Sequence, residues 1–184
     1  MTLANRITIF RLSLIPVLCV CIFFYSRERE WLRWAALGVY VFVAVSDFAD
    51  GFIARRYQQR SRLGARLDPL ADKLVVNLGL VFLAANWEFG PRLPMWFPVF
   101  ILGRDIFIVM GAYTIKVYAG KLRVEPRFSG KLSTAFQIAT IIGMLLGVSF
   151  LPFLYYSTVA VSLYAVLGYV AMGYRQITQR SATG

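Results

Sequence analysis

The feature that most constrains this chain is a long uncharged run in its carboxyl-terminal third. From Leu132 to Tyr174 the sequence has 43 residues without a charged side chain. A transmembrane helix needs about 20 mostly apolar residues, so this run is long enough to cross a membrane twice. Pro152, within the stretch Leu151–Ser157, marks the expected turn between the two crossings because proline interrupts a continuing helix. The run therefore predicts a membrane protein built from helices.

Shorter apolar runs earlier in the chain extend the prediction to an all-α, polytopic bundle of six transmembrane helices. The expected helices span residues 5–25, 32–57, 64–87, 94–119, 130–150 and 153–176. Composition agrees, since 59% of the residues are apolar and 16% are charged, against about 45–50% and about 25% in a soluble domain. We expect one membrane domain over residues 1–184, with its first helix retained because no small-residue cleavage site follows it.

The basic residues predict the orientation of these helices. With both termini inside, 14 Lys and Arg residues lie on the cytoplasmic side and 4 lie outside. Cytoplasmic flanks of membrane helices carry such an excess, which predicts a protein of the cell inner membrane with cytoplasmic termini. The net charge of +11 is then explained by these flanks and by attraction to membrane lipids, and we expect no nucleic-acid partner.

Two absences narrow the chemistry. The chain has no histidine, which excludes catalytic triads and phosphohistidine intermediates. Its two cysteines, Cys19 and Cys21, form neither a CxxC motif nor a zinc-binding set.

Four aspartates fall within one short stretch of sequence. Asp47 and Asp50 are three residues apart, and Asp68 and Asp72 are four apart, so each pair shares one face of a helix. Four close carboxylates repel one another and are costly to desolvate, whereas a divalent cation such as Mg²⁺, Mn²⁺ or Ca²⁺ neutralises them. The alternative is that these acids pair with neighbouring arginines in a solvated loop, which explains the charge balance but not the two spacings.

The complete pattern around these acids is Asp47-x2-Asp50-Gly51-x2-Ala54-Arg55-x8-Gly64-x3-Asp68-x3-Asp72. It resembles the signature of the CDP-alcohol phosphatidyltransferase family at every signature position. The resemblance implies an integral membrane enzyme, commonly a homodimer. Such an enzyme transfers a phosphatidyl group from a CDP-linked donor, here CDP-diacylglycerol, to an alcohol and releases CMP.

The resemblance also implies roles for individual residues. Asp47, Asp50, Asp68 and Asp72 would hold two divalent ions, Mg²⁺ or Mn²⁺, and Asp72 would be the general base. Residues implied to bind the nucleotide are Gly51, Ala54, Arg55 and Gly64, together with Asn5 and Thr8 from a looser family pattern.

The acceptor must be inferred from the later part of the chain. Arg104 and Asp105 lie inside an apolar helix, either as a structural ion pair or with Arg104 binding a phosphate. Gln137 is expected to bond either the acceptor or a neighbouring helix. The residues predicted to bind an acceptor phosphate are Arg104, Arg123, Arg127 and Lys131.

The sequence around these residues resembles the family branch of phosphatidylglycerophosphate synthases and CMP-releasing cardiolipin synthases. We therefore expect a phosphorylated alcohol as the acceptor, with glycerol 3-phosphate favoured. Phosphatidylglycerol and inositol phosphate are the alternatives within the family. Outside it, a cation transporter would use four intramembrane carboxylates but would not need the Gly51-x2-Ala54-Arg55 element.

Overall fold

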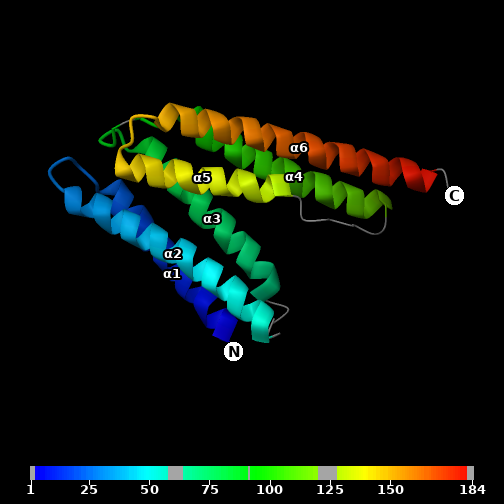
Figure 1. Cartoon of the computed structure of the whole chain (residues 1–184), viewed down its shortest axis with the longest axis horizontal. Helices are drawn as coiled ribbons and strands as arrows, with labels where there is room; N and C mark the ends of the chain where they lie inside the picture. Colours follow the sequence, from blue (N-terminus) through cyan, green and yellow to red (C-terminus); the bar gives the residue numbers. More distant parts are fainter. Residues whose placement is uncertain (1–2, 58–63, 91, 120–127, 182–184) are drawn as a thin grey trace. The chain divides into compact units, whose positions relative to one another are not determined.

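The computed structural model describes residues 3–57, 64–90, 92–119 and 128–181. Within these ranges it leaves undescribed the side chains of residues 3–9, 11, 47–57, 64–72, 115–116, 118–119, 128 and 174–181. The described ranges form six helices (Figure 1): α1 Leu3–Phe23, α2 Glu30–Tyr57, α3 Gly64–Ala85, α4 Trp96–Ala119, α5 Phe128–Leu146 and α6 Leu151–Ser181. The all-helical prediction and its six helices are confirmed, and most helix ends lie within two residues of their expected positions.

Three segments are long and apolar enough to cross a membrane in the part of the chain that the structure describes: Trp96–Thr114, Ser129–Leu146 and Leu151–Gly173. Helices α1 and α3 contain shorter apolar segments, Leu12–Phe23 and Lys73–Ala85. The end of α2 and the start of α3 carry the charged residues of the sequence motif, and these charges shorten the apolar stretches of the two helices.

The helices belong to two compact units. Unit 1 contains α1, α2 and α3 with residues 141–149, and unit 2 contains α4 and α6 with the part of α5 before residue 141.

In unit 1, α1 packs against both α2 and α3. Leu18 and Ile22 of α1 and Leu80 and Leu83 of α3 are fully buried in its core. Burial of such a side chain stabilises a fold by about 1.5–3 kcal/mol where the exposed state meets water.

The side chain of Asn86 joins the ends of α1 and α3 through hydrogen bonds. The amide nitrogen Nδ2 of Asn86 donates hydrogen bonds to the carbonyl oxygens of Ile22 and Tyr25, at 2.6 and 3.0 Å. Ile22 lies in the last turn of α1 and Tyr25 lies two residues beyond its end, where backbone carbonyls need partners outside the helix. Tyr25 also stacks on Phe89, with 3.9 Å between ring centroids.

Because α1, α2 and α3 alternate in direction, three helix ends gather at the opposite end of unit 1. These are the start of α1, the end of α2 and the start of α3, which lie near the amino terminus in Figure 1. The acid motif lies on the last two of these ends.

In unit 2, α4 packs on α6. Their amino-terminal ends meet through an aromatic cluster in which Trp96 and Phe97 contact Tyr155, with ring centroids 5.9 and 5.8 Å apart. Two hydroxyl pairs join α5 to α6: Ser133 to Ser162 at 2.7 Å and Thr140 to Thr158 at 3.0 Å.

The chain turns after α5 earlier than Pro152 suggested. Helix α5 ends at Leu146, and Gly147 adopts a φ of 71°. The Gly147 and Val148 amides donate to the carbonyls of Met144 and Gly143, each at 3.0 Å, as in a Schellman termination. Glycine takes this left-handed conformation at low cost, whereas Pro152 lies in the first turn of α6, a position where proline is tolerated. The turn that was predicted around Pro152 is therefore formed by residues 147–150.

Candidate functional site

The four motif aspartates lie on unbroken helical backbone. Asp47 and Asp50 belong to α2, and Asp68 and Asp72 belong to α3. Continuous helix through each pair keeps its two residues on one face, as the spacing predicted. The side chains of all four lie outside the described residues, so the metal site stays a prediction.

The predicted nucleotide-binding residues belong to the same end of unit 1. Asn5 and Thr8 lie in the first turns of α1, and Gly64 is the first residue of α3. Gly51, Ala54 and Arg55 lie in the last turns of α2. Their side chains are also outside the described residues, but the backbone brings the start of α1 to the end of α2 and the start of α3, which are far from it in the sequence (Figure 1).

Unit 2 holds a second polar group, buried in an apolar helix. Arg104 and Asp105 of α4 are 9% and 8% exposed, and Arg104 Nη1 lies 2.9 Å from Asp105 Oδ1. The ion pair considered as one interpretation of these residues is therefore present. A buried charge needs such a partner, because an isolated ion in a low-dielectric environment is strongly destabilised.

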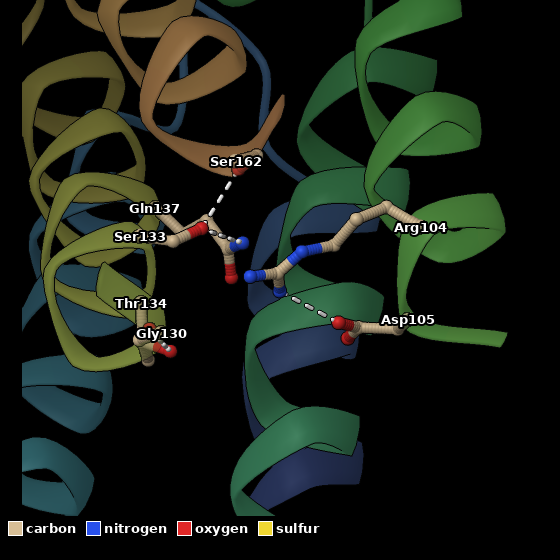
Figure 2. A network of polar contacts seen from close by, with 7 residues as sticks. All are labelled: Arg104, Asp105, Gly130, Ser133, Thr134, Gln137 and Ser162. Atoms are coloured by element: carbon tan, nitrogen blue, oxygen red, sulfur yellow. Dashed lines mark hydrogen bonds and ion pairs between the residues drawn. The ribbon is translucent and has the colours of Figure 1, made fainter. Parts of the chain in front are cut away.

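The ion pair with Asp105 leaves part of the Arg104 guanidinium without a hydrogen-bond partner among the described residues. Its Nε is buried and has no hydrogen-bond partner within the described ranges. An unsatisfied buried donor costs about 1–3 kcal/mol, and more when it is charged. Figure 2 shows the guanidinium extending from α4 toward Gln137 and Ser133 of α5.

The α5 side of this cluster is formed by neutral polar groups. Gln137 is 4% exposed, while Ser133 and Ser162 are fully buried. Gln137 Nε2 donates to Ser133 Oγ over 3.4 Å, and Ser133 Oγ lies 2.7 Å from Ser162 Oγ (Figure 2). The sequence indicated Gln137 as a candidate but did not indicate the serine pair. Its only signal was a small polar residue on each of two neighbouring apolar helices, where such residues often face each other.

The other predicted acceptor-binding residues are in different surroundings. Lys131, in the first turns of α5, is exposed, in contrast to the buried Arg104. Arg123 and Arg127 lie outside the described residues. Among the described residues, no group of three or more His, Cys, Asp or Glu side chains is placed to hold a metal.

Comparison with known proteins places this arrangement in a family. The family model described as CDP-alcohol phosphatidyltransferase matches residues 1–172, which include every helix that carries the candidate residues. The chain belongs to the CDP-alcohol phosphatidyltransferase family. Membership confirms the resemblance drawn from the motif, identifies the chain as a phosphatidyltransferase enzyme of a membrane-bound family, and leaves the cation transporter without support.

Similar members of the family share one name, CDP-diacylglycerol--glycerol-3-phosphate 3-phosphatidyltransferase. The protein of that name from Yersinia enterocolitica is 31% identical over 143 residues, which are 76% of this chain and 74% of the relative. The one from Cereibacter sphaeroides is 37% identical over 108 residues, 58% of this chain and 47% of the relative. The one from Pseudomonas fluorescens is 39% identical over 109 residues, 59% of this chain and 53% of the relative. The matched part of this chain thus spans about half of the last two relatives.

Proposed function

We propose that this protein transfers the phosphatidyl group of CDP-diacylglycerol to glycerol 3-phosphate and releases CMP. Family membership supports the reaction type, and the name shared by the similar proteins supports the acceptor. The observation that carries the proposal is the acid motif, complete in sequence and located on two helix ends at one end of unit 1. Phosphatidylglycerol and inositol phosphate are less favoured, since neither occurs in those names.

The donor set of the motif fits hard divalent cations. Asp47, Asp50, Asp68 and Asp72 supply carboxylate oxygens, which suit Mg²⁺ and Mn²⁺, and we assign two ions to them. When bound, these ions neutralise the diphosphate of the donor and stabilise the departing CMP.

The chain's own groups then control the transfer. The acceptor hydroxyl oxygen forms a bond to the phosphorus that carries diacylglycerol. The bond from that phosphorus to the bridging oxygen breaks, and CMP leaves with the electron pair. The hydroxyl proton passes to a carboxylate oxygen of Asp72, the assigned general base. With no histidine in the chain, a well-positioned carboxylate is a suitable base.

Further residues of the chain are assigned to the two substrates. Gly51, Ala54 and Gly64 have little or no side chain, which lets a nucleotide approach the helix backbone closely. Arg55, Asn5 and Thr8 contribute polar groups to the same end of unit 1. The phosphate of the acceptor is assigned to Arg104, Arg123, Arg127 and Lys131, whose positive charge it complements.

We propose that all six helices cross the membrane and that the protein is a homodimer, as the family resemblance implies. The motif end of unit 1 faces the cytoplasm, because 14 of the chain's Lys and Arg residues fall on the cytoplasmic side in that arrangement. The acyl chains of the donor then stay in lipid while its cytidine head enters from the cytoplasm. A cysteine introduced at Arg60 tests this orientation, since an impermeant reagent should label it in inverted vesicles but not in intact cells.

A panel of acceptors tests the reaction. Purified protein in lipid nanodiscs receives CDP-diacylglycerol with glycerol 3-phosphate, phosphatidylglycerol or inositol phosphate, and CMP and the lipid product are measured by mass spectrometry. We expect product with glycerol 3-phosphate, loss of product with EDTA, and recovery with excess Mg²⁺ or Mn²⁺. Product with inositol phosphate alone would contradict the proposed acceptor and leave the family assignment standing.

A further inference from the structure

The buried cluster of unit 2 has more hydrogen-bond donors than it uses internally. A guanidinium carries five N–H donors. Asp105 accepts from Arg104 Nη1 at 2.9 Å, whereas Arg104 Nε has no partner among the described residues although the side chain is only 7% exposed. A buried cationic donor in this state is suited to an oxyanion ligand.

The Gln137 side chain and the Arg104 guanidinium point toward one another (Figure 2), and the hydrogen bond that Gln137 donates within the described residues is long. Its bond to Ser133 Oγ, at 3.4 Å, is longer than the usual 2.7–3.2 Å of an N–H···O bond. The Ser133 hydroxyl is itself engaged with Ser162 at 2.7 Å. The Gln137 amide is thus directed by α5 toward Arg104 (Figure 2), while the serine pair already joins α5 to α6.

The chemistry of this pair matches one kind of ligand. A guanidinium binds phosphate oxygens, and a primary amide both donates to and accepts from a hydroxyl group. Because Gln137 is neutral, it adds selectivity for a hydroxyl without adding charge for the phosphate. The two side chains together complement a phosphate monoester with a hydroxyl on the adjacent carbon, as in glycerol 3-phosphate.

We propose that Gln137 is a specificity-determining residue, which hydrogen-bonds the secondary hydroxyl of glycerol 3-phosphate while Arg104 binds its phosphate. This inference rests on the proposed function. It adds that the acceptor is selected by its middle hydroxyl as well as by its charge. A site built to bond a substrate hydroxyl rejects the analogue that lacks it, because the buried polar groups of the site are then left unpaired.

The test compares glycerol 3-phosphate with 3-hydroxypropyl phosphate, which keeps the phosphate and the reacting primary hydroxyl but lacks the secondary hydroxyl. The wild-type enzyme should prefer glycerol 3-phosphate by about 10- to 100-fold in kcat/KM. Gln137→Met, similar in length and without hydrogen-bonding groups, should lose most of this preference by losing activity on glycerol 3-phosphate alone. Thr140→Val is the matched control, since it removes a buried hydroxyl from the same helix and should keep the preference.

Each outcome is decisive. Equal kcat/KM for the two acceptors in the wild-type enzyme would overturn the inference without any variant, so it stays testable even if Gln137→Met fails to fold. A folded Gln137→Met enzyme that keeps the wild-type preference, or that slows equally on both acceptors, would assign Gln137 to helix packing. A wild-type enzyme that makes CMP with another alcohol but not with glycerol 3-phosphate would overturn the proposed function itself, and this inference with it.

Discussion

The acid-bearing end of unit 1 and the buried cluster of unit 2 are organised in opposite ways. The first concentrates four carboxylates on two helix ends within one stretch of sequence. The second takes one or two buried polar residues from each of three largely apolar helices: Arg104 and Asp105 of α4, Ser133 and Gln137 of α5, and Ser162 of α6. A local motif carries its spacing in the sequence, whereas a dispersed cluster exists only once helices have packed. The two regions should therefore fail differently when changed.

The largest effect is expected at the acid-bearing end. Asp68→Asn removes one negative charge from the proposed metal site at nearly constant volume, and turnover should fall by about 10²–10³-fold. Glu88→Gln, an exposed change outside the motif, is the control and should be close to wild type. The measurement is CMP release from CDP-diacylglycerol, with thermal unfolding of both variants. Near-normal turnover of Asp68→Asn would remove this end from the catalytic site.

The next largest effect is expected in the buried cluster, where two variants distinguish a loss of stability from a loss of activity. Asp105→Asn leaves Arg104 without its anionic partner, and breaking a buried pair costs about 3–5 kcal/mol of stability. The double variant Arg104→Met with Asp105→Leu should recover much of that stability, because no uncompensated charge remains. The double variant should nevertheless be inactive if Arg104 binds the acceptor. Unfolding in detergent and CMP release measure the two properties, and an active double variant would mean that the pair is purely structural.

A smaller effect is expected at the turn after α5, which contains no residue of either region. Gly147→Ala forces alanine into a left-handed conformation at a cost of about 1–2 kcal/mol. The added Cβ would also collide with the Arg33 guanidinium, which donates through Nε to the carbonyl of Leu145. Stability should fall while kcat/KM for both substrates stays near the wild-type value. Gly38→Ala, where an added Cβ meets no atom within 4 Å, is the control.

The smallest effect concerns the second hydroxyl pair between α5 and α6. Replacing Thr140 and Thr158 together by valine removes the 3.0 Å bond and both of its polar partners. Interhelical hydrogen bonds in membranes contribute about 0.6 kcal/mol on average, so the melting temperature should move by only a few degrees. A loss as large as that of Asp105→Asn would show that this neutral polar pair contributes as much to the stability of unit 2 as the ion pair does.

The contrast between the two regions also explains which parts of the structure could be predicted from sequence. Helix positions were predictable because long apolar runs bounded by charges define them almost directly. The prediction from Pro152 puts the end of α5 too late, because the helix terminates at Gly147 and glycine is the residue that favours a left-handed helix termination. The Ser133–Ser162 pair depends on the register between two helices, which no local pattern specifies. The carboxylates of the acid motif lie outside the described residues, so their arrangement remains a prediction from spacing.

The two hydrogen bonds donated by Asn86 also affect the position of the opposite end of unit 1. Its bonds to Ile22 and Tyr25 join the end of α1 to the end of α3, while packing against α2 and α3 holds the rest of α1. A helix rises 1.5 Å per residue, so the 21 residues of α1 span about 30 Å, and a tilt of about 5° at the end bonded by Asn86 would displace the other end by about 2.6 Å. Such a displacement is close to the length of a metal–oxygen bond. The hydrogen bonds of Asn86 thus act together with the packing of α1 on α2 and α3 to hold the start of α1 in place beside the helix ends that carry the aspartates.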